Sequence, residues 1–293
     1  MTGRQATQAL ADPPAILELN GVSAHYGKVR RRGPGDRRPA ARRRSPGGSG
    51  ALLPALAGVH LTVHPGESLG IVGESGSGKT TLGKCVVGLM PISAGQILFR
   101  GQVVGRPGRV ADVPRVNGVQ MVYQDPYSAL NPKRTVGSTL REILTVHKLC
   151  ARSQAQKRSA ELLESVGLSA DILKRRPRSL SGGMCQRVAI ARALAFGPTV
   201  LVADEVVSAL DASVQAQVLN LIADTRETAG LTVIFITHDL AVVNQVCDRV
   251  IVLNRGAVVE SGLTADILSR PSDPYTRSLI DAVPELAGEL WQR

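Results

Sequence analysis

Short apolar runs along the chain alternate with longer amphipathic stretches. Largely apolar runs stand at 68–72, 119–123, 200–203 and 232–237, and each is followed by glycine or a polar residue. Apolar runs of this length are typical of buried strands, whereas apolar residues at helical spacing, as in 153–166, indicate amphipathic helices. Strands that alternate with helices form parallel sheets, so the pattern predicts an α/β fold with a mostly parallel sheet.

The remaining segments complete this organisation. Helical spacing at 139–149 and 153–166 predicts a helical section between about 125 and 180, and the pattern from Thr80 to Met90 predicts another helix. Further strands are expected at 15–22, 56–63, 249–253 and 257–260, with a short hairpin at 95–104.

A glycine-rich segment after the 68–72 run has the form G-x-x-x-x-G-K-T. Glycines let the backbone wrap around an anion, and the helix that follows turns its free N–H groups toward the same anion. In this motif the lysine lies against the β- and γ-phosphates and the hydroxyl holds Mg²⁺. The segment therefore predicts a nucleoside triphosphate site built from Gly73, Glu74, Ser75, Gly76, Ser77, Gly78, Lys79 and Thr80.

A net charge of +11 is a common sign of nucleic-acid binding, but here it is concentrated in one segment. Nine basic residues and one acid fall between 28 and 45 and supply eight of the eleven net charges. Residues 28–50 lack apolar periodicity, so we expect a flexible solvated loop, with an anionic lipid or a nucleic acid as its alternative partner. An aromatic content of 3% argues against base stacking, and no specific nucleic acid is expected.

No apolar run approaches the ~20 residues that a membrane span requires, and residues 1–14 lack the apolar core of a signal peptide. We therefore expect a cytoplasmic protein with a disordered tail at 1–14 that reaches the membrane only through partners. The four cysteines form no C-x-x-C pair, which argues against a zinc or iron–sulfur site and favours buried reduced thiols.

Three features beyond the phosphate loop could carry chemistry. Asp204 ends an apolar strand, where it could orient Mg²⁺ through water, and Glu205 beside it could activate the attacking water. Ser181 and two glycines open a helix that could offer N–H groups to a phosphate, although an ordinary serine helix cap would give the same sequence pattern. His238 follows the strand at 232–237, and a lone histidine at such a place is more often structural than catalytic.

Taken together, these motifs resemble the ATP-binding-cassette (ABC) ATPase family from about residue 16 to 285. The resemblance implies ATP and Mg²⁺ as cofactors, an antiparallel β subdomain before the parallel core, and a helical subdomain at about 125–195. The implied catalytic residues are Glu205, His238 and Gln124, and the implied metal ligands are Thr80, Gln124 and Asp204. Besides the phosphate loop, the implied nucleotide contacts are Tyr26 on adenine, Thr81, Ser181, Gly182, Gly183 and Asp211.

The family also implies partners. Two ATPase subunits, identical or related, would form a head-to-tail dimer in which each ATP lies between the phosphate loop of one chain and the Ser181–Gly183 motif of the other. The helical section would dock two transmembrane permease subunits, which places the chain on the cytoplasmic face of the inner membrane. An extracytoplasmic substrate-binding protein would take part only indirectly.

Segments 123–132, 208–220 and 273–277 are similar to the ATPases of dipeptide, oligopeptide and nickel importers, and most to the second ATPase of each pair. The resemblance implies a nucleotide-binding domain at 15–264 and an importer-type extension at 265–293. A nickel or metal-chelate importer, and a soluble complex such as carbon–phosphorus lyase, remain alternatives. Met184 and Val206 stand where the family usually has glutamine and proline, and Val206 is expected to loosen the turn beside Glu205.

Overall fold

The computed structural model describes residues 14–25 and 54–282. Tyr26, the arginine-rich segment 28–50 and almost all of the tail at 1–14 lie outside the described residues, so the expectations for them stay predictions. Within the described residues no helix is both long and apolar enough to cross a membrane.

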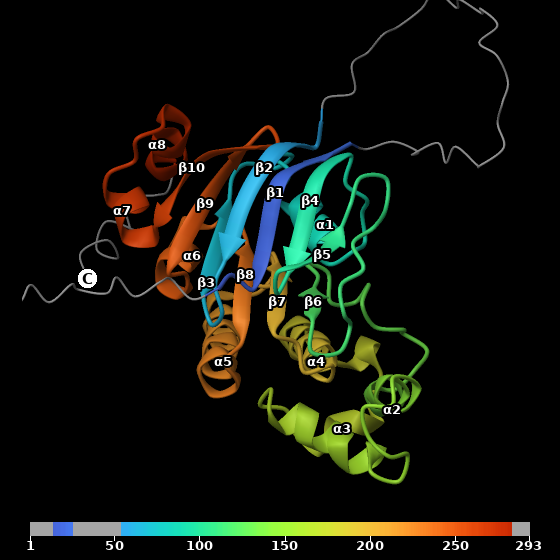
Figure 1. Ribbon diagram of the computed structural model, residues 1–293. Helices are drawn as coiled ribbons and strands as arrows, with labels where there is room; N and C mark the ends of the chain where they lie inside the picture. Colours follow the sequence, from blue (N-terminus) through green and yellow to red (C-terminus); the bar gives the residue numbers. More distant parts are fainter. Residues whose placement is uncertain (1–13, 26–53, 283–293) are drawn as a thin grey trace, which may run out of the picture.

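A six-stranded sheet forms the centre of the molecule (Figure 1). Five neighbouring strands are parallel, and the edge strand β10 is antiparallel to β9. The prediction of a mostly parallel sheet is therefore confirmed. In spatial order the strands are β10 (Ala257–Leu263), β9 (Arg249–Asn254), β3 (Ser68–Val72), β8 (Thr232–Ile236), β7 (Val200–Asp204) and β6 (Val119–Val122).

A second, four-stranded sheet is antiparallel throughout its pairings, which confirms the antiparallel β subdomain that the family resemblance implied. Its alternating buried and exposed positions show that one face packs inward. In spatial order its strands are β2 (Leu56–Val63), β1 (Leu17–Ala24), β4 (Ala94–Phe99) and β5 (Gln102–Gly105).

The central sheet separates two hydrophobic cores because successive side chains of a strand point to opposite faces. Val200 and Val202 of β7 pack with α1 (Lys79–Val86) and the antiparallel sheet. Leu201 and Ala203 pack on the other face with α4 (Gly182–Leu194), α5 (Ala212–Ala229) and α6 (Leu240–Val246). Both faces are thus covered, which explains why the parallel strands are mostly apolar, with their polar residues largely at the strand ends.

The helical section extends from one end of the sheets (Figure 1). It contains α2 (Val136–Val146), α3 (Ala155–Glu164) and the short turns η1 (Ala170–Lys174) and η2 (Pro177–Ser179), and it leads into α4. The last helices, α7 (Thr264–Ser269) and α8 (Pro274–Asp281), lie beside β9 and β10, well away from α2 and α3 (Figure 1).

Helix ends differ from the sequence expectations by a few residues. The helix expected at 139–149 is α2, which begins earlier because the Thr135 hydroxyl caps it and accepts the Ser138 N–H. The helix expected from Thr80 to Met90 ends at Val86, and Gly88 with φ +73° turns the chain away. Such ends depend on single capping residues rather than on periodicity.

Candidate functional site

The phosphate loop joins the end of β3 to the start of α1 in the conformation that its glycines permit. Gly73, Gly76 and Gly78 have φ of +148°, +83° and +108°, which side chains on L-residues rarely allow. A methyl group on Gly73 would lie 2.2 Å from the Leu253 carbonyl oxygen, whereas one on Gly76 would meet no atom within 4 Å. Gly73 is therefore required by close backbone packing, and Gly76 by its backbone conformation.

Lys79 opens α1 and points its amine back into the loop. Its Nζ donates hydrogen bonds to the carbonyl oxygens of Gly73 at 2.6 Å and Glu74 at 2.8 Å. Burial lowers the pKa of Lys79, and the nearby carboxylates of Glu205, Asp204 and Glu74 partly offset this effect. A phosphate at the loop would bring this buried cation a direct negative partner.

Asp204 ends β7 next to the phosphate loop and is buried. Its Oδ1 accepts a hydrogen bond from the Thr80 hydroxyl at 3.1 Å. Burial raises the pKa of Asp204, and the bond from Thr80 opposes that rise. A buried carboxylate of this kind is stabilised by a cation, so the position fits the metal-orienting role expected from the sequence.

Glu205 follows Asp204 with φ +48°, an uncommon value for a residue other than glycine. Its N–H donates to the Ile236 carbonyl at 2.8 Å, which fixes the backbone between β7 and β8. Its carboxylate accepts a hydrogen bond from Gln124 Nε2 at 2.7 Å, and the other oxygen lies 3.4 Å from Nδ1 of His238. Three residues distant in sequence are thus brought together.

Lys79, Thr80, Gln124 and Glu205 border one cleft of about 450 Å³, whereas Asp204 and His238 lie next to its lining residues. Gln124 and Glu205 form one wall, and the phosphate loop with the start of α1 forms the other. Pro54 and Ala55, which precede β2, complete it and were not anticipated from the sequence because no motif marks them. The lining residues are Pro54, Ala55, Ser75, Gly76, Gly78, Lys79, Thr80, Thr81, Gln124 and Glu205.

The oxygen donors beside the cleft fit a magnesium ion. Thr80 offers a hydroxyl, Asp204 a carboxylate and Gln124 an amide oxygen, which are the hard ligands that Mg²⁺ prefers. In the part of the chain that the structure describes, no group of three or more His, Cys, Asp or Glu side chains could hold a metal. Mg²⁺ takes about six oxygen ligands, so at this position phosphate oxygens or water would complete the three donors from the protein.

The remaining predicted contacts form a second, separate group. Ser181 caps α4, its Oγ accepting the Met184 N–H at 3.3 Å, and Asp211 caps α5 through the Val214 N–H at 3.0 Å. The first turns of the two helices touch, because a methyl group on Gly183 would lie 2.2 Å from Val214 Cγ1. Ser181, Gly182, Gly183 and Asp211 do not line the cleft beside the phosphate loop.

The structure also adds one neighbour of the loop that sequence reasoning missed. The hydroxyl of Tyr275 on α8 accepts the Glu74 N–H at 3.0 Å. Segment 273–277 was noted only for its resemblance to importer ATPases, and no local pattern signals that it meets residue 74. In this arrangement the Glu74 N–H is directed to Tyr275 rather than to a phosphate.

Val206 occupies the position where the resemblance led us to expect a looser turn. Its side chain is 3% exposed and belongs to the core formed with α4 and α5. Burial of a valine contributes roughly 1.5–3 kcal/mol of hydrophobic stabilisation, so this residue helps to anchor the turn beside Glu205.

Comparison with known proteins identifies what this arrangement is similar to. The family described as ABC transporter matches residues 56–208. A protein of Brucella abortus strain 2308, whose name describes a peptide import ATP-binding protein, is 46% identical over 240 residues, which are 82% of this chain and 72% of that protein. The glutathione import ATP-binding protein of Pectobacterium atrosepticum is 45% identical over 78% of this chain, but the match spans only 37% of that protein.

A solved structure has a similar fold. It is a dimeric post-hydrolysis state of an ATP-binding cassette bound to ADP and Pi, with a TM-score of 0.67 and 26% identity. The match covers 85% of this chain and 98% of that one.

Proposed function

Because the chain belongs to the ABC transporter family of ATP-hydrolysing proteins, we propose that it is the ATPase subunit of a membrane importer for peptides. The observation that carries the chemical part is the cluster in which Gln124 and His238 both approach the Glu205 carboxylate next to the phosphate loop. The relatives named for peptide and glutathione import support the choice of solute class.

The proposed reaction assigns one task to each group in the cleft. The phosphate loop and Lys79 hold the triphosphate, and Mg²⁺, when bound, neutralises phosphate charge beside Thr80 and Asp204. Glu205 accepts a proton from the attacking water, and its fixed backbone holds the carboxylate in place. The side chain of His238 is 60% exposed and lies 3.4 Å from the Glu205 carboxylate, so we assign it a contact with the γ-phosphate that is bound beside Glu205.

The separation of the two groups of contacts supports a dimer. Ser181 and the two following glycines lie at the start of α4, outside the cleft that holds the phosphate loop. A head-to-tail pair of chains would bring these N–H groups to the γ-phosphate bound by the other chain. ATP would then join the two subunits, and hydrolysis would release them.

A larger cleft of about 730 Å³ offers a place for the permease. It lies between β6 and the helical section, and the apolar side chains of Leu89 and Val110 at its edge are 56% and 50% exposed. Its charged lining is mixed, because Arg115 and Arg192 stand with Asp112 and with an ion pair between Arg134 and Glu142. We assign this cleft to a helical segment of the permease that presents apolar side chains to Leu89 and Val110.

A direct covalent path joins the permease cleft to the ATP cleft. Tyr123 lines the larger cleft, and the next residue, Gln124, donates its hydrogen bond to Glu205. Movement of the helical section against the core therefore changes the position of Gln124 at the catalytic carboxylate. This is how ATP binding and hydrolysis would drive alternating access in the membrane.

The first test is to purify the tagged chain from its native membrane in mild detergent and to identify what accompanies it. Two permease subunits with a related second ATPase would support the importer, and an associated binding protein would then report the solute. Recovery of soluble enzyme subunits, or of the chain alone, would contradict the transport role.

A matched pair of variants tests the docking cleft. Val110→Arg should abolish recovery of the permease while leaving ATP binding unchanged, because it places a charge in the cleft. Val146→Arg should retain the permease, since Val146 is 66% exposed but lies outside the cleft. Equal recovery with both variants would rule out the assigned surface.

A further inference from the structure

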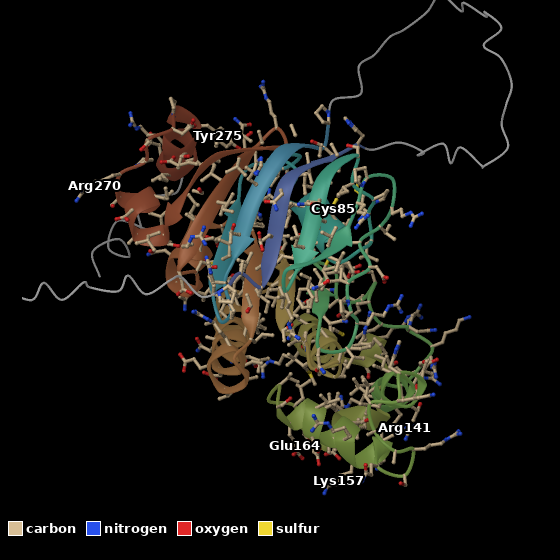
Figure 2. The ribbon with its side chains drawn as sticks, viewed as in Figure 1. Cys85, Arg141, Lys157, Glu164, Arg270 and Tyr275 are labelled. Carbon is tan, nitrogen blue, oxygen red and sulfur yellow. The ribbon has the colours of Figure 1, made fainter. Side chains whose placement is uncertain are left out.

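The C-terminal helix α8 is part of the structure that supports the phosphate loop. Tyr275, in its first turn, lies beside the sheet edge formed by β10, whereas Arg141 and Lys157 of the helical section lie at the opposite end of the molecule (Figure 2). The Tyr275 hydroxyl nevertheless reaches the backbone of Glu74, 201 residues earlier.

Several contacts fix α8 in this position. Asp273 caps the helix and accepts the Tyr275 N–H at 2.8 Å, while Glu260 of β10 accepts the N–H groups of Ser272 at 2.7 Å and Asp273 at 3.2 Å. Burial raises the pKa of Glu260, but the side chain of Thr276 and the N–H groups of Ser272 and Asp273 together outweigh it and hold the pKa below its ordinary value. The ionised carboxylate thus holds the turn that precedes the helix.

Apolar packing continues this support to the loop itself. Leu279 and Ile280 of α8 and Ile267 of α7 border the same small apolar gap as Val72, the last residue of β3. The gap between them is too small to hold water. Helix α8 therefore packs on the same hydrophobic core as the residue that precedes the phosphate loop.

One peptide group of the loop is held from both sides. The carbonyl of Gly73 accepts from Lys79 at 2.6 Å, and the N–H of Glu74, which belongs to the same peptide group, donates to Tyr275 at 3.0 Å. The carbonyl and the N–H of a trans peptide point in opposite directions, so the two bonds together set the rotation of the peptide plane. That rotation also sets where Lys79 Nζ lies.

We propose that Tyr275 is a positioning residue of the nucleotide site, which holds the Gly73–Glu74 peptide and, through it, Lys79 in the ATP-binding arrangement. This rests on the proposed function only in taking ATP as the ligand. Without the hydroxyl the peptide can rotate, and a smaller fraction of the free protein is ready to bind. Loss of the hydroxyl is therefore expected to lower nucleotide affinity and to leave the rate of the chemical step unchanged.

The test is Tyr275→Phe in the full chain, with ATP and Mg²⁺ binding measured by calorimetry. Loss of one hydrogen bond predicts a Kd that is about two- to tenfold weaker. KM should rise by a similar factor with little change in kcat. Ser278→Ala is the matched control, because it removes a hydroxyl from the same helix that bonds only to the Tyr275 carbonyl.

A double-mutant cycle distinguishes an effect of Tyr275 through the Glu74 N–H from a general stabilising effect of Tyr275 on the protein. Glu74→Pro removes the N–H, so adding Tyr275→Phe to it should change Kd no further. Glu74→Ala keeps the N–H, so Tyr275→Phe should there retain its full effect. An equal effect of Tyr275→Phe in both backgrounds would overturn the proposal.

Amide hydrogen exchange gives a second measurement that does not need the proline variant. The Glu74 amide should exchange faster in Tyr275→Phe than in wild type, and it should be unchanged in Ser278→Ala. Unchanged exchange and unchanged Kd in Tyr275→Phe would refute the positioning role. Failure of the wild-type chain to bind ATP would instead refute the proposed function.

Discussion

Replacing Gly183 by alanine tests how the starts of α4 and α5 pack together. The added methyl group would lie 2.2 Å from Cγ1 of Val214, whereas Cβ and Cγ2 of the same valine lie at 3.5 and 3.7 Å. Carbon atoms in contact are normally about 3.5–4.0 Å apart, so the variant requires a displacement of about 1.5 Å. Valine in a helix is nearly confined to one rotamer, and therefore the helices must separate.

Overpacking of this kind costs about 1–3 kcal/mol of the free energy of unfolding. Alanine gains up to about 1 kcal/mol over glycine in helix propensity, which offsets only part of that loss. With the full gain in propensity the net loss is up to about 2 kcal/mol, which corresponds to a decrease in melting temperature of up to roughly 8 °C.

Thermal unfolding followed by circular dichroism measures this change, and the chain offers a matched control. Gly182→Ala should be neutral or stabilising, because its methyl group would meet nothing closer than Leu210 Cδ2 at 3.7 Å. Val214→Ala should rescue Gly183→Ala by removing the clashing atom. Equal melting temperatures for the two alanine variants, or no rescue, would show that the close packing of the two helices is not what requires Gly183.

Three further outcomes are expected. Glu205→Gln should lower the rate of ATP hydrolysis by about 10²–10⁴-fold and leave ATP binding intact, because the amide keeps the contact with Gln124 but cannot accept a proton. Phosphate release measures the rate, and near-normal turnover would exclude Glu205 as the base. Lys79→Ala should weaken ATP binding by about 10- to 100-fold in calorimetry through loss of a charged hydrogen-bond donor, and undiminished affinity would contradict its place at the phosphates. Glu260→Gln should lower the melting temperature at pH 7. Because the folded-state pKa of Glu260 lies below its ordinary value of 4.5, its contribution is fully present above that value and is lost as the pH falls through the folded-state pKa, so a difference in melting temperature that does not shrink on acidification would refute the anchoring role.

Much of the fold could be predicted from the sequence because its signals are local. The strand expected at 56–63 is β2 with the same ends, and that expected at 119–123 is β6, one residue shorter. Both carry hydrophobic patterns of a few residues bounded by polar or turn residues. The start of α2 was placed too late, since its Thr135 cap lies outside the apolar periodicity.

The candidate site likewise has a part that local sequence predicts and a part that depends on contacts between distant residues. Glycine, lysine and threonine at fixed spacing mark the phosphate loop, because an anion site at a helix N-terminus requires those residue types in one short segment. The contact of Glu205 with both Gln124 and His238 could be expected only through the family resemblance. Tyr26 lies outside the described residues, and its place on adenine stays a prediction.

The sequence by itself determined the α/β pattern, the phosphate loop and the family to which the chain belongs. Only the tertiary structure decided which distant residues meet, such as Tyr275 with Glu74 and Gly183 with Val214. Strand periodicity and glycine backbone angles are set by interactions within a few residues, and these leave a pattern in the sequence. A contact across 201 residues depends on how both segments pack on the sheet, and no local pattern records that.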